Sequence, residues 1–287
     1  MNFWMSAVQV IKSPAELTNL LFRLKQNTKQ IGFVPTMGFL HAGHISLVKR
    51  SKKENDVTVV SIFVNPTQFG PKEDFKNYPQ NTKRDLAMLR KAKVDYVLLP
   101  SVQDVYPKDF NAYIKASSLS RALCGLRRPG HFDGVVTVVK RLFDIVLPDN
   151  TYFGQKDFQQ FQVIKEMTKR FHLPVEVVMC QTVREKDGLA MSSRNSYLNS
   201  DERVRARTLS KSLALAKLLI RQGVKSSEVI KREIKAILIP QVDRIDYIEV
   251  ANADSLKRIG RIKGEVLIAL ACFVGKARLI DNLLIEV

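Results

Sequence analysis

The sequence predicts an α/β fold in which a doubly wound parallel sheet is followed by a smaller α+β domain. Short apolar runs alternate with helical stretches from Ile31 onward. These runs are continuously apolar, as is typical of strands that helices cover on both faces. Beyond Gln181 the pattern changes, because long helical stretches there precede two β-rich runs. The chain has 287 residues, 45% of them hydrophobic, which is enough for one large or two modest domains.

The elements expected in the first domain follow a βαβαβ rhythm. Continuous apolar runs predict strands at 31–34, 57–64, 94–99, 151–153 and 175–179. Helical stretches between them predict helices at 44–55, 82–93, 135–146 and 157–171. This order indicates a Rossmann-like sheet, in which ligands bind at the carboxyl ends of the strands.

The second part of the chain begins with a polar loop at 184–196. Helices are then expected at 201–222 and 226–237, and strands at 245–250 and 266–274. We therefore assign residues 1–182 to the Rossmann-like domain and residues 183–287 to a C-terminal α+β lid domain.

Composition excludes several protein classes. Charged residues make up 26% of the chain and Gly and Pro number 13 and 11, which excludes disordered and collagen-like chains. The longest apolar stretch, Val266–Val274, is about half of what a bilayer-spanning helix needs. Residues 1–20 lack a secretory signal pattern, so we expect a cytoplasmic protein without a membrane partner. Cys124, Cys180 and Cys272 have no CxxC spacing and are expected to be reduced, buried thiols.

The net charge of +18 raises the question of nucleic-acid binding. The basic excess is 11 in residues 1–182 and 7 in residues 183–287, so no single segment carries it. Basic clusters lie in helical stretches, where a charged run is usually a solvated face. We expect no nucleic-acid partner, although an RNA-binding protein built on this sheet stays an alternative until salt-dependent RNA binding is tested.

One segment stands where the first strand of the sheet passes into its first helix, Pro35-Thr-Met-Gly-Phe-Leu-His-Ala-Gly-His44. Gly38 and Gly43 allow the backbone to approach a ligand closely, and the amino end of a helix favours a phosphate. His41 and His44 are three residues apart, a spacing that also suits half of a metal site or a purely structural turn. The segment therefore indicates a nucleotide site, with those two alternatives open.

This segment resembles the signature of the pantoate-β-alanine ligase family. Its ending, His-x-Gly-His, is also the nucleotidyltransferase motif of class I aminoacyl-tRNA synthetases. Further matches follow in family order: Phe63-Val-Asn-Pro-Thr-Gln-Phe69, Arg128-Pro-Gly-His-Phe132, Phe153-Gly-Gln-Lys-Asp-Phe-Gln-Gln160, Asp187-Gly-Leu-Ala-Met-Ser-Ser-Arg-Asn195 and Ala277-Arg-Leu-Ile-Asp-Asn282. The resemblance thus covers residues 31–282.

The resemblance implies a reaction in two steps that leads toward coenzyme A. ATP and pantoate give pantoyl adenylate and pyrophosphate, and the amine of β-alanine then displaces AMP to give pantothenate. It also implies Mg²⁺ beside ATP as co-substrate, and a homodimer. A nucleotidyltransferase of the same superfamily that acts on a small phosphorylated acceptor is the alternative.

The family's functional residues map onto this sequence at matching positions. The resemblance implies catalytic roles for His44, His41, Lys156 and Arg194. Residues expected to bind ATP are Met37, Gly38, Phe39, Leu40, His41, Ala42, Gly43, His44, Gly154, Gln155, Lys156, Asp157, Val183, Met191, Ser192, Ser193 and Arg194. Gln68 and Gln160 are expected to bind pantoate, and Gln68 to border the β-alanine site. The expected site therefore draws on both predicted domains.

Several of these residues also have structural interpretations. Lys156 alone could be a surface lysine, Asp157 a helix cap, and Ser192 with Ser193 ordinary loop residues. The magnesium ligands are unknown. Asp85 is either a contributor by family position or a surface ion partner of its basic neighbours Lys83 and Arg84.

Overall fold

The computed structural model describes residues 8–71 and 73–287, and contacts divide the chain into two compact units. Residues 1–7, on which the expected absence of a secretory signal partly rests, lie outside this range. The first unit comprises residues up to 117 together with 129–154 and 163–180. The second comprises 118–128, 155–162 and 181–287.

The two short segments 118–128 and 155–162 join the second unit although the sequence boundary after 182 places them in the first domain. Hydrogen bonds of side-chain amides join these segments to each other and to the rest of the second unit. Gln159 Nε2 donates to the carbonyls of Leu119 and Ala122, and Gln162 Nε2 donates to the carbonyl of Ala253. The functional domain limits at 182 and 183 stay a prediction.

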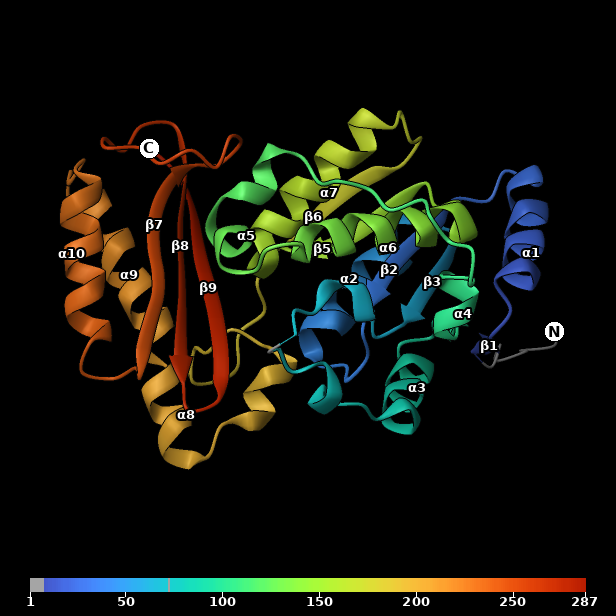
Figure 1. The fold of residues 1–287 in the computed structure, drawn as a ribbon, viewed down its shortest axis with the longest axis horizontal. Coiled ribbons are helices and arrows are strands. Elements are labelled where there is room, and N and C mark those ends of the chain that lie inside the picture. Colours follow the sequence, from blue (N-terminus) through green and yellow to red (C-terminus); the bar gives the residue numbers. More distant parts are fainter. Residues whose placement is uncertain (1–7, 72) are drawn as a thin grey trace. The chain divides into compact units, whose positions relative to one another are not determined.

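A six-stranded parallel sheet forms the first unit, which confirms the predicted fold class (Figure 1). Its strands are β1 (Gln9–Ile11), β2 (Ile31–Thr36), β3 (Val57–Ile62), β4 (Tyr96–Leu98), β5 (Asn150–Gly154) and β6 (Glu176–Cys180), in the order β1-β4-β3-β2-β5-β6. All five expected strands are present. The three-residue β1 was not expected, because so short a run has no detectable periodicity.

Helices cover both faces of this sheet. The helices are α1 (Pro14–Gln26), α2 (Ala42–Glu54), α3 (Thr82–Lys91), α4 (Val102–Val105), α6 (His131–Val146) and α7 (Phe158–Arg170), which crosses the division between the units. Leu47 of α2 and Leu89 of α3 share a core with Val34 of β2. The next residue back, Phe33, points to the opposite face and contacts Phe143 of α6, with ring centroids 6.3 Å apart.

The strand order reverses between β2 and β5. The chain leaves β2 toward β3 and leaves β5 toward β6, on the other side. Ligands bind at such a switch point, outside the carboxyl ends of the strands. The segment 37–41 follows β2 here, and the one-turn 3-10 helix η4 (Gln155–Asp157) follows β5 in the chain.

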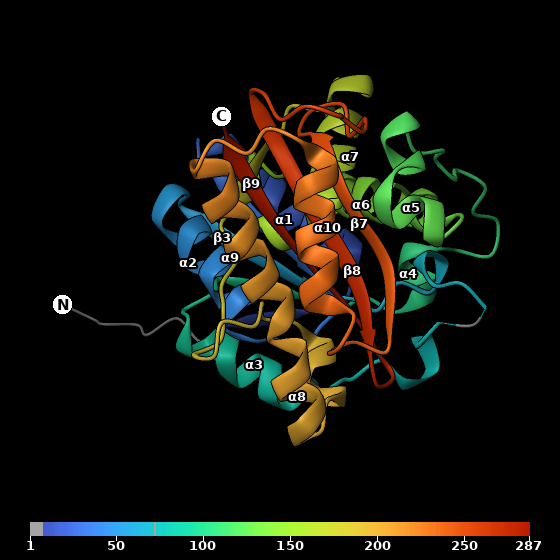
Figure 2. The same ribbon diagram turned by 90° about the vertical axis from the view of Figure 1, so that its left-hand side faces the viewer.

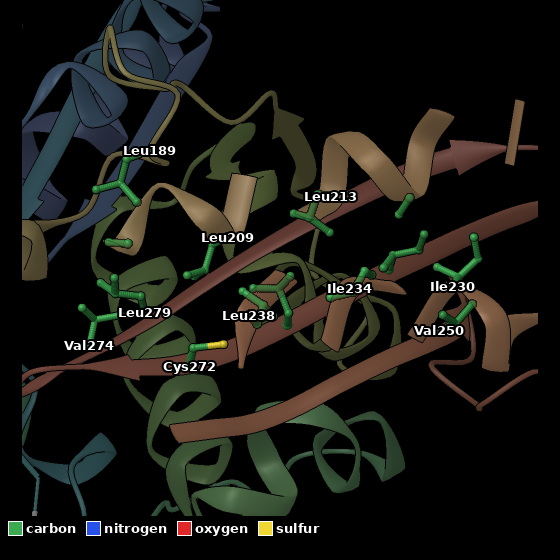
Figure 3. Packing of buried hydrophobic residues seen from close by; sticks show 14 of the residues in the cluster. Leu189, Leu209, Leu213, Ile230, Ile234, Leu238, Val250, Cys272, Val274 and Leu279 are labelled. Atoms are coloured by element: carbon green, nitrogen blue, oxygen red, sulfur yellow. The ribbon is translucent and has the colours of Figure 1, made fainter. Parts of the chain in front are cut away.

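An antiparallel sheet of three strands forms the centre of the second unit, with α9 (Thr208–Arg221) and α10 (Ser227–Leu238) on one face (Figure 2). The strands are β7 (Arg244–Asn252), β8 (Glu265–Val274) and β9 (Ala277–Glu286). Figure 3 shows Leu213 of α9 and Ile234 of α10 in the same buried cluster as Cys272 of β8. This is the α+β domain that the sequence predicts.

Two details of the second unit differ from the expected elements. The helix expected over 201–222 is divided into α8 (Ser200–Ala206) and α9 at Arg207, which is the C-cap of the first helix and the N-cap of the second. The strand β9 was not expected, because Arg278, Asp281 and Asn282 interrupt its apolar pattern.

The remaining helices are short: α5 (Leu123–Arg127) and the 3-10 turns η1 (Pro66–Gln68), η2 (Phe75–Asn77), η3 (Ser118–Arg121) and η5 (Ser193–Tyr197). Cys124, Cys180 and Cys272 are buried and free, as expected. No helix in residues 8–71 or 73–287 combines the length and apolar character that a membrane span requires.

Candidate active site

The loop between β2 and α2 has two consecutive residues in the left-handed region. Gly38 has φ +84° and Phe39 has φ +49°. A Cβ atom on Gly38 would lie 3.0 Å from the Cγ2 of Ile62 and 3.2 Å from Oδ2 of Asp85, so a side chain does not fit there without movement. A left-handed phenylalanine is unfavourable and needs external support.

Asp85 in the first turn of α3 supplies that support. Its carboxylate is buried, with 1% of the residue exposed. Oδ2 accepts from the backbone N–H of Phe39 at 2.7 Å, and Oδ1 accepts from that of Leu40 at 2.8 Å. Hydrogen bonds to an ionised acceptor are the stronger kind, so Asp85 holds the loop in its left-handed form.

This geometry corrects one interpretation of Asp85 and weakens the other. Asp85 is not a surface ion partner, because helix α3 directs it inward under the loop rather than toward solvent. Both carboxylate oxygens already accept backbone N–H groups, and the described part of the chain holds no cluster of three His, Cys, Asp or Glu side chains suited to a metal. Within the described residues, Asp85 is therefore assigned to holding the loop, and no three-ligand metal cluster accompanies it.

The two histidines cap the amino end of α2 reciprocally. Nδ1 of His41 accepts from the backbone N–H of Gly43 at 3.2 Å, and Nδ1 of His44 accepts from the N–H of His41 at 3.3 Å. The ring centroids are 4.0 Å apart. Because Nδ1 is the acceptor in both rings, the neutral imidazoles carry their proton on Nε2. Each histidine thus combines a structural cap with an N–H donor on its other edge.

Gln68 lies beside this loop on η1, which follows β3. It is 8% exposed, and its Nε2 lies 3.1 Å from the Sδ of Met37. Its Oε1 accepts from Nδ2 of Asn65 at 3.1 Å. The predicted pantoate-binding glutamine and the first predicted ATP-binding residue are therefore in contact.

Asn65 connects this glutamine to the rest of the first unit. Its Oδ1 accepts from the hydroxyl of Tyr106 at 2.8 Å. Burial raises the pKa of Tyr106 to about 12, so the phenol keeps the proton that it donates at neutral pH. The amide of Asn65 is thereby held in one orientation, with its NH₂ group toward Gln68.

Residues at the start of α6 form hydrogen bonds with η1 and with Asn65, the residue before it. Nδ1 of His131 lies 2.8 Å from the carbonyl oxygen of Gln68, and Nδ2 of Asn65 donates to the carbonyl of Gly134 at 3.2 Å. A Cβ atom on Gly134 would lie 2.4 Å from the carbonyl oxygen of Thr67. Only glycine allows this backbone approach, which explains its place in an otherwise apolar helix.

In the second unit, η4 places Lys156 and Asp157 side by side. Nζ of Lys156 lies 3.6 Å from Oδ1 of Asp157, and their side chains are 17% and 47% exposed. Gln160 is partly buried in the first turn of α7. The side chain of Lys156 is thus mostly buried, which differs from the fully solvated surface lysine that the sequence also allowed.

The segment 183–195 forms a closed hairpin in the same unit. The carbonyl of Val183 accepts from the N–H of Met191 at 3.0 Å. Nδ2 of Asn195 donates to Glu185 at 2.7 Å across the base of the hairpin. Ser192 caps η5 by accepting from the N–H of Arg194 at 3.3 Å, so its hydroxyl also has a structural task. Val183, Met191, Ser192 and Arg194 therefore belong to one ordered segment.

Comparisons with known proteins agree along nearly the whole chain. A family model described as pantoate-beta-alanine ligase matches residues 9–284. The pantothenate synthetase of Thermosipho africanus is 54% identical over 278 residues, which is 97% of this chain and 100% of that relative. The chain belongs to the pantoate-beta-alanine ligase family. It is an enzyme, a ligase of pantothenate biosynthesis that joins pantoate to β-alanine.

Solved structures of the ligase family share the fold. The crystal structure of pantothenate synthetase from Thermus thermophilus has a TM-score of 0.91 and 41% identity, covering 96% of this chain and 99% of that one. A pantoate-beta-alanine ligase from Francisella tularensis, complexed with beta-gamma ATP and beta-alanine, has a TM-score of 0.79 and 35% identity, covering 97% and 98%.

For this ligase, each unit brings together part of the predicted site. The first unit holds Met37, Gly38, Phe39, Leu40, His41, Ala42, Gly43, His44 and Gln68 around the carboxyl ends of β2 and β3, with Gly154 at the end of β5. The second holds Gln155, Lys156, Asp157, Gln160, Val183, Met191, Ser192, Ser193 and Arg194.

Three supporting residues are absent from the expected site, Asn65, His131 and Asn282, and a fourth, Asp85, was expected there only as a possible metal contributor. All are less than 10% exposed. Asn65, His131 and Asn282 lie inside the matched family segments. These three residues are polar and lie next to apolar residues within the matched segments. That pattern is the signal by which the sequence could have identified them.

Proposed function

We propose that this ligase works through pantoyl adenylate, with ATP as co-substrate and with pyrophosphate and AMP as products. Family membership supports the overall reaction, and the Francisella tularensis relative, described with beta-gamma ATP and beta-alanine, supports these two ligands. The single observation that carries the proposal is the reciprocal cap at the amino end of α2, in which Nδ1 of both histidines accepts, so that Nε2 of each neutral ring is the donor.

These donors suit the first step of the reaction. When the carboxylate of pantoate attacks the α-phosphorus of ATP, negative charge grows on the non-bridging oxygens. Preorganised N–H groups stabilise this charge more in the transition state than in the ground state. The backbone N–H groups and the positive end of α2 add to that effect. We assign His44 as the principal donor and His41 as the second one.

The cations of the second unit suit the departing pyrophosphate. Lys156 offers a compact charge, whereas the planar fork of Arg194 matches two phosphate oxygens at once. We propose that both act on the phosphates of the same ATP, together with Ser192 and Ser193, while Asp157 binds a ribose hydroxyl and the backbone of Val183 contacts adenine. In this view residues 183–287 act as a lid that shields the labile adenylate from water.

Gln68 and Gln160 are proposed to bind pantoate. A primary amide can donate to a carboxylate and accept from a hydroxyl. The NH₂ group of Asn65 orients the Oε1 of Gln68, so the NH₂ group of Gln68 lies on the side of Met37, where it can donate to a substrate carboxylate. In the second step the amine of β-alanine attacks the acyl carbon beside Gln68 and releases AMP.

Pantoate-dependent exchange of labelled pyrophosphate into ATP tests the proposal. With Mg²⁺ present and β-alanine absent, we expect exchange only when pantoate is added, because only a reversible adenylation returns label to ATP. A folded sample that binds ATP but shows no exchange would contradict the adenylate and favour a nucleotidyltransferase that uses a phosphorylated acceptor.

A second prediction concerns Gln160. Replacing Gln160 with Ala should raise the KM for pantoate by roughly ten- to a hundredfold and leave the KM for ATP within about twofold, because a hydrogen bond to a charged group such as the pantoate carboxylate contributes about 1.5–3 kcal/mol. Initial rates at varied pantoate and ATP measure both constants. Gln222→Ala, at the exposed end of α9, is the matched control. Equal losses for the two substrates would contradict the assignment.

Magnesium, a homodimer and a cytoplasmic location also belong to the proposal. Mg²⁺ would arrive on the ATP phosphates, since magnesium commonly takes few protein ligands, and there it would neutralise phosphate charge. The homodimer and the cytoplasmic location stay predictions from the resemblance and the composition.

A further inference from the structure

The last strand of the chain contains two buried polar residues in succession. Asp281 and Asn282 in β9 are 2% and 5% exposed. Polar groups at such burial are costly unless they are fully hydrogen-bonded, and apolar residues would pair equally well in this sheet. The partners of these two side chains therefore indicate what they contribute.

Asn282 binds the backbone of η4. Its Nδ2 donates to the carbonyl oxygens of Gln155 and Lys156, both at 2.9 Å, and its Oδ1 accepts from Nε2 of Gln155 at 3.3 Å. Both hydrogens and the oxygen of one amide are thus used on two consecutive residues. A turn held at two successive carbonyls cannot rotate its peptide planes, so the Cα–Cβ direction of Lys156 is fixed by Asn282.

Asp281 holds the hairpin 183–195. Its carboxylate accepts from both guanidinium NH₂ groups of Arg184, at 2.7 and 3.0 Å, and Oδ1 also accepts from the N–H of Asn282 at 2.8 Å. Arg184 follows Val183 and pairs with Ala190, directly before Met191. Two adjacent residues of β9 therefore hold both segments of the second unit to which ATP-binding roles are assigned above.

We propose that Asn282 is a positioning residue for Lys156 in the adenylation step. This inference rests on the proposed function, in which Lys156 stabilises the phosphates. Asn282 acts through the backbone of η4. Asp281 holds the neighbouring hairpin through Arg184 and also accepts from the backbone N–H of Asn282. A displacement of a reacting group by about 1 Å costs up to a hundredfold in rate, so two lost hydrogen bonds at this turn should be visible in kcat.

A double-mutant cycle between Asn282 and Lys156 tests the proposal, with pyrophosphate exchange as the readout. Asn282→Asp has the same shape but puts an oxygen where the NH₂ group faced two carbonyls. We expect it to lower the kcat of exchange at least tenfold, with the KM for pantoate within about twofold, since orientation acts on the transition state. In the Lys156→Ala background the same change should lower exchange less than about twofold, because residues that act as a unit are not additive.

Controls separate positioning from general destabilisation. Asn252→Asp is the matched change at the end of β7, where the side chain oxygen accepts from Ser255 and has no part in η4, and it should leave exchange unaltered. Asn282→Ala, which introduces no charge, is carried through the same cycle in case the aspartate variant does not fold. Thermal unfolding of each variant shows that the kinetic comparison is made on folded protein.

The outcomes distinguish the inference from the function on which it rests. Loss of exchange by the same factor with and without Lys156 would overturn the positioning role and leave the proposed function intact. Wild-type exchange in both Asn282 variants would also overturn the positioning role and leave the proposed function intact. Full exchange in Lys156→Ala would overturn the role of Lys156 in the proposed function, and the inference with it.

Discussion

Replacing His44 with Asn is expected to reduce pantoate-dependent exchange to about 1% of the wild-type rate or less, since removing one preorganised donor costs roughly a hundred- to a thousandfold. The amide oxygen of asparagine can take the place of Nδ1 and accept from the N–H of His41, so the cap of α2 survives. What it lacks is the donor at the Nε2 position. We therefore expect an inactive variant with nearly unchanged thermal stability.

His44→Gln is the complementary variant. The NH₂ group of glutamine reaches toward the position of Nε2, and glutamine at the third helical position can also accept the N–H of the cap residue through its side-chain oxygen. Exchange should recover in part, while the melting temperature should stay near that of the wild type. His172→Asn, at a left-handed position after α7 that asparagine adopts readily, is the matched control and should exchange as the wild type does. Exchange above one third of wild type in His44→Asn would remove His44 from the catalytic step.

Asp85→Asn should lower exchange by roughly ten- to a hundredfold, chiefly through a higher KM for ATP. The amide keeps one acceptor but turns its NH₂ group toward the N–H of Phe39 or Leu40. One buried backbone donor is then unpaired, which costs about 1–3 kcal/mol of stability and releases the left-handed loop. Exchange at varied ATP, together with urea unfolding, measures the two effects.

A magnesium titration distinguishes this positioning role from metal binding. If Asp85 ligated the metal, excess Mg²⁺ would restore the exchange of the asparagine variant, because the lost affinity is overcome by mass action. A misplaced loop is not restored in this way, so we expect the defect to persist at saturating Mg²⁺. Asp109→Asn, at an exposed position, controls for the loss of one charge. Recovery at high Mg²⁺ would contradict our assignment.

The main parts of the fold follow from local patterns. The runs 31–34 and 57–64 correspond to β2 and β3, and the stretch 82–93 corresponds to α3, because a buried parallel strand needs a continuous apolar run and a covering helix needs one apolar face. Their order also determines the switch point, since right-handed crossovers leave few topologies open. The sequence alone therefore places the segment 35–44 at the ligand-binding edge of the parallel sheet.

Patterns failed where polar residues are buried for a tertiary reason. In β9, Asp281 and Asn282 break the apolar run, yet their partners Arg184 and Gln155 lie about a hundred residues away. The division of α8 from α9 falls at Arg207, within a stretch whose helical pattern runs unbroken from 201 to 222. Neither outcome is encoded in periodicity alone.

The sequence by itself determined the fold class, the family and the segments that carry the candidate chemistry, because periodicity, glycine placement and contiguous motifs are local properties of the chain. Tertiary structure alone decided that Asp85 binds a loop rather than solvent, that the Nδ1 atoms of His41 and His44 cap a helix, and that Asn282 holds the turn of Lys156. The physical reason is that hydrogen-bond partners of buried polar groups come from distant segments, whose meeting depends on the packing of the whole core.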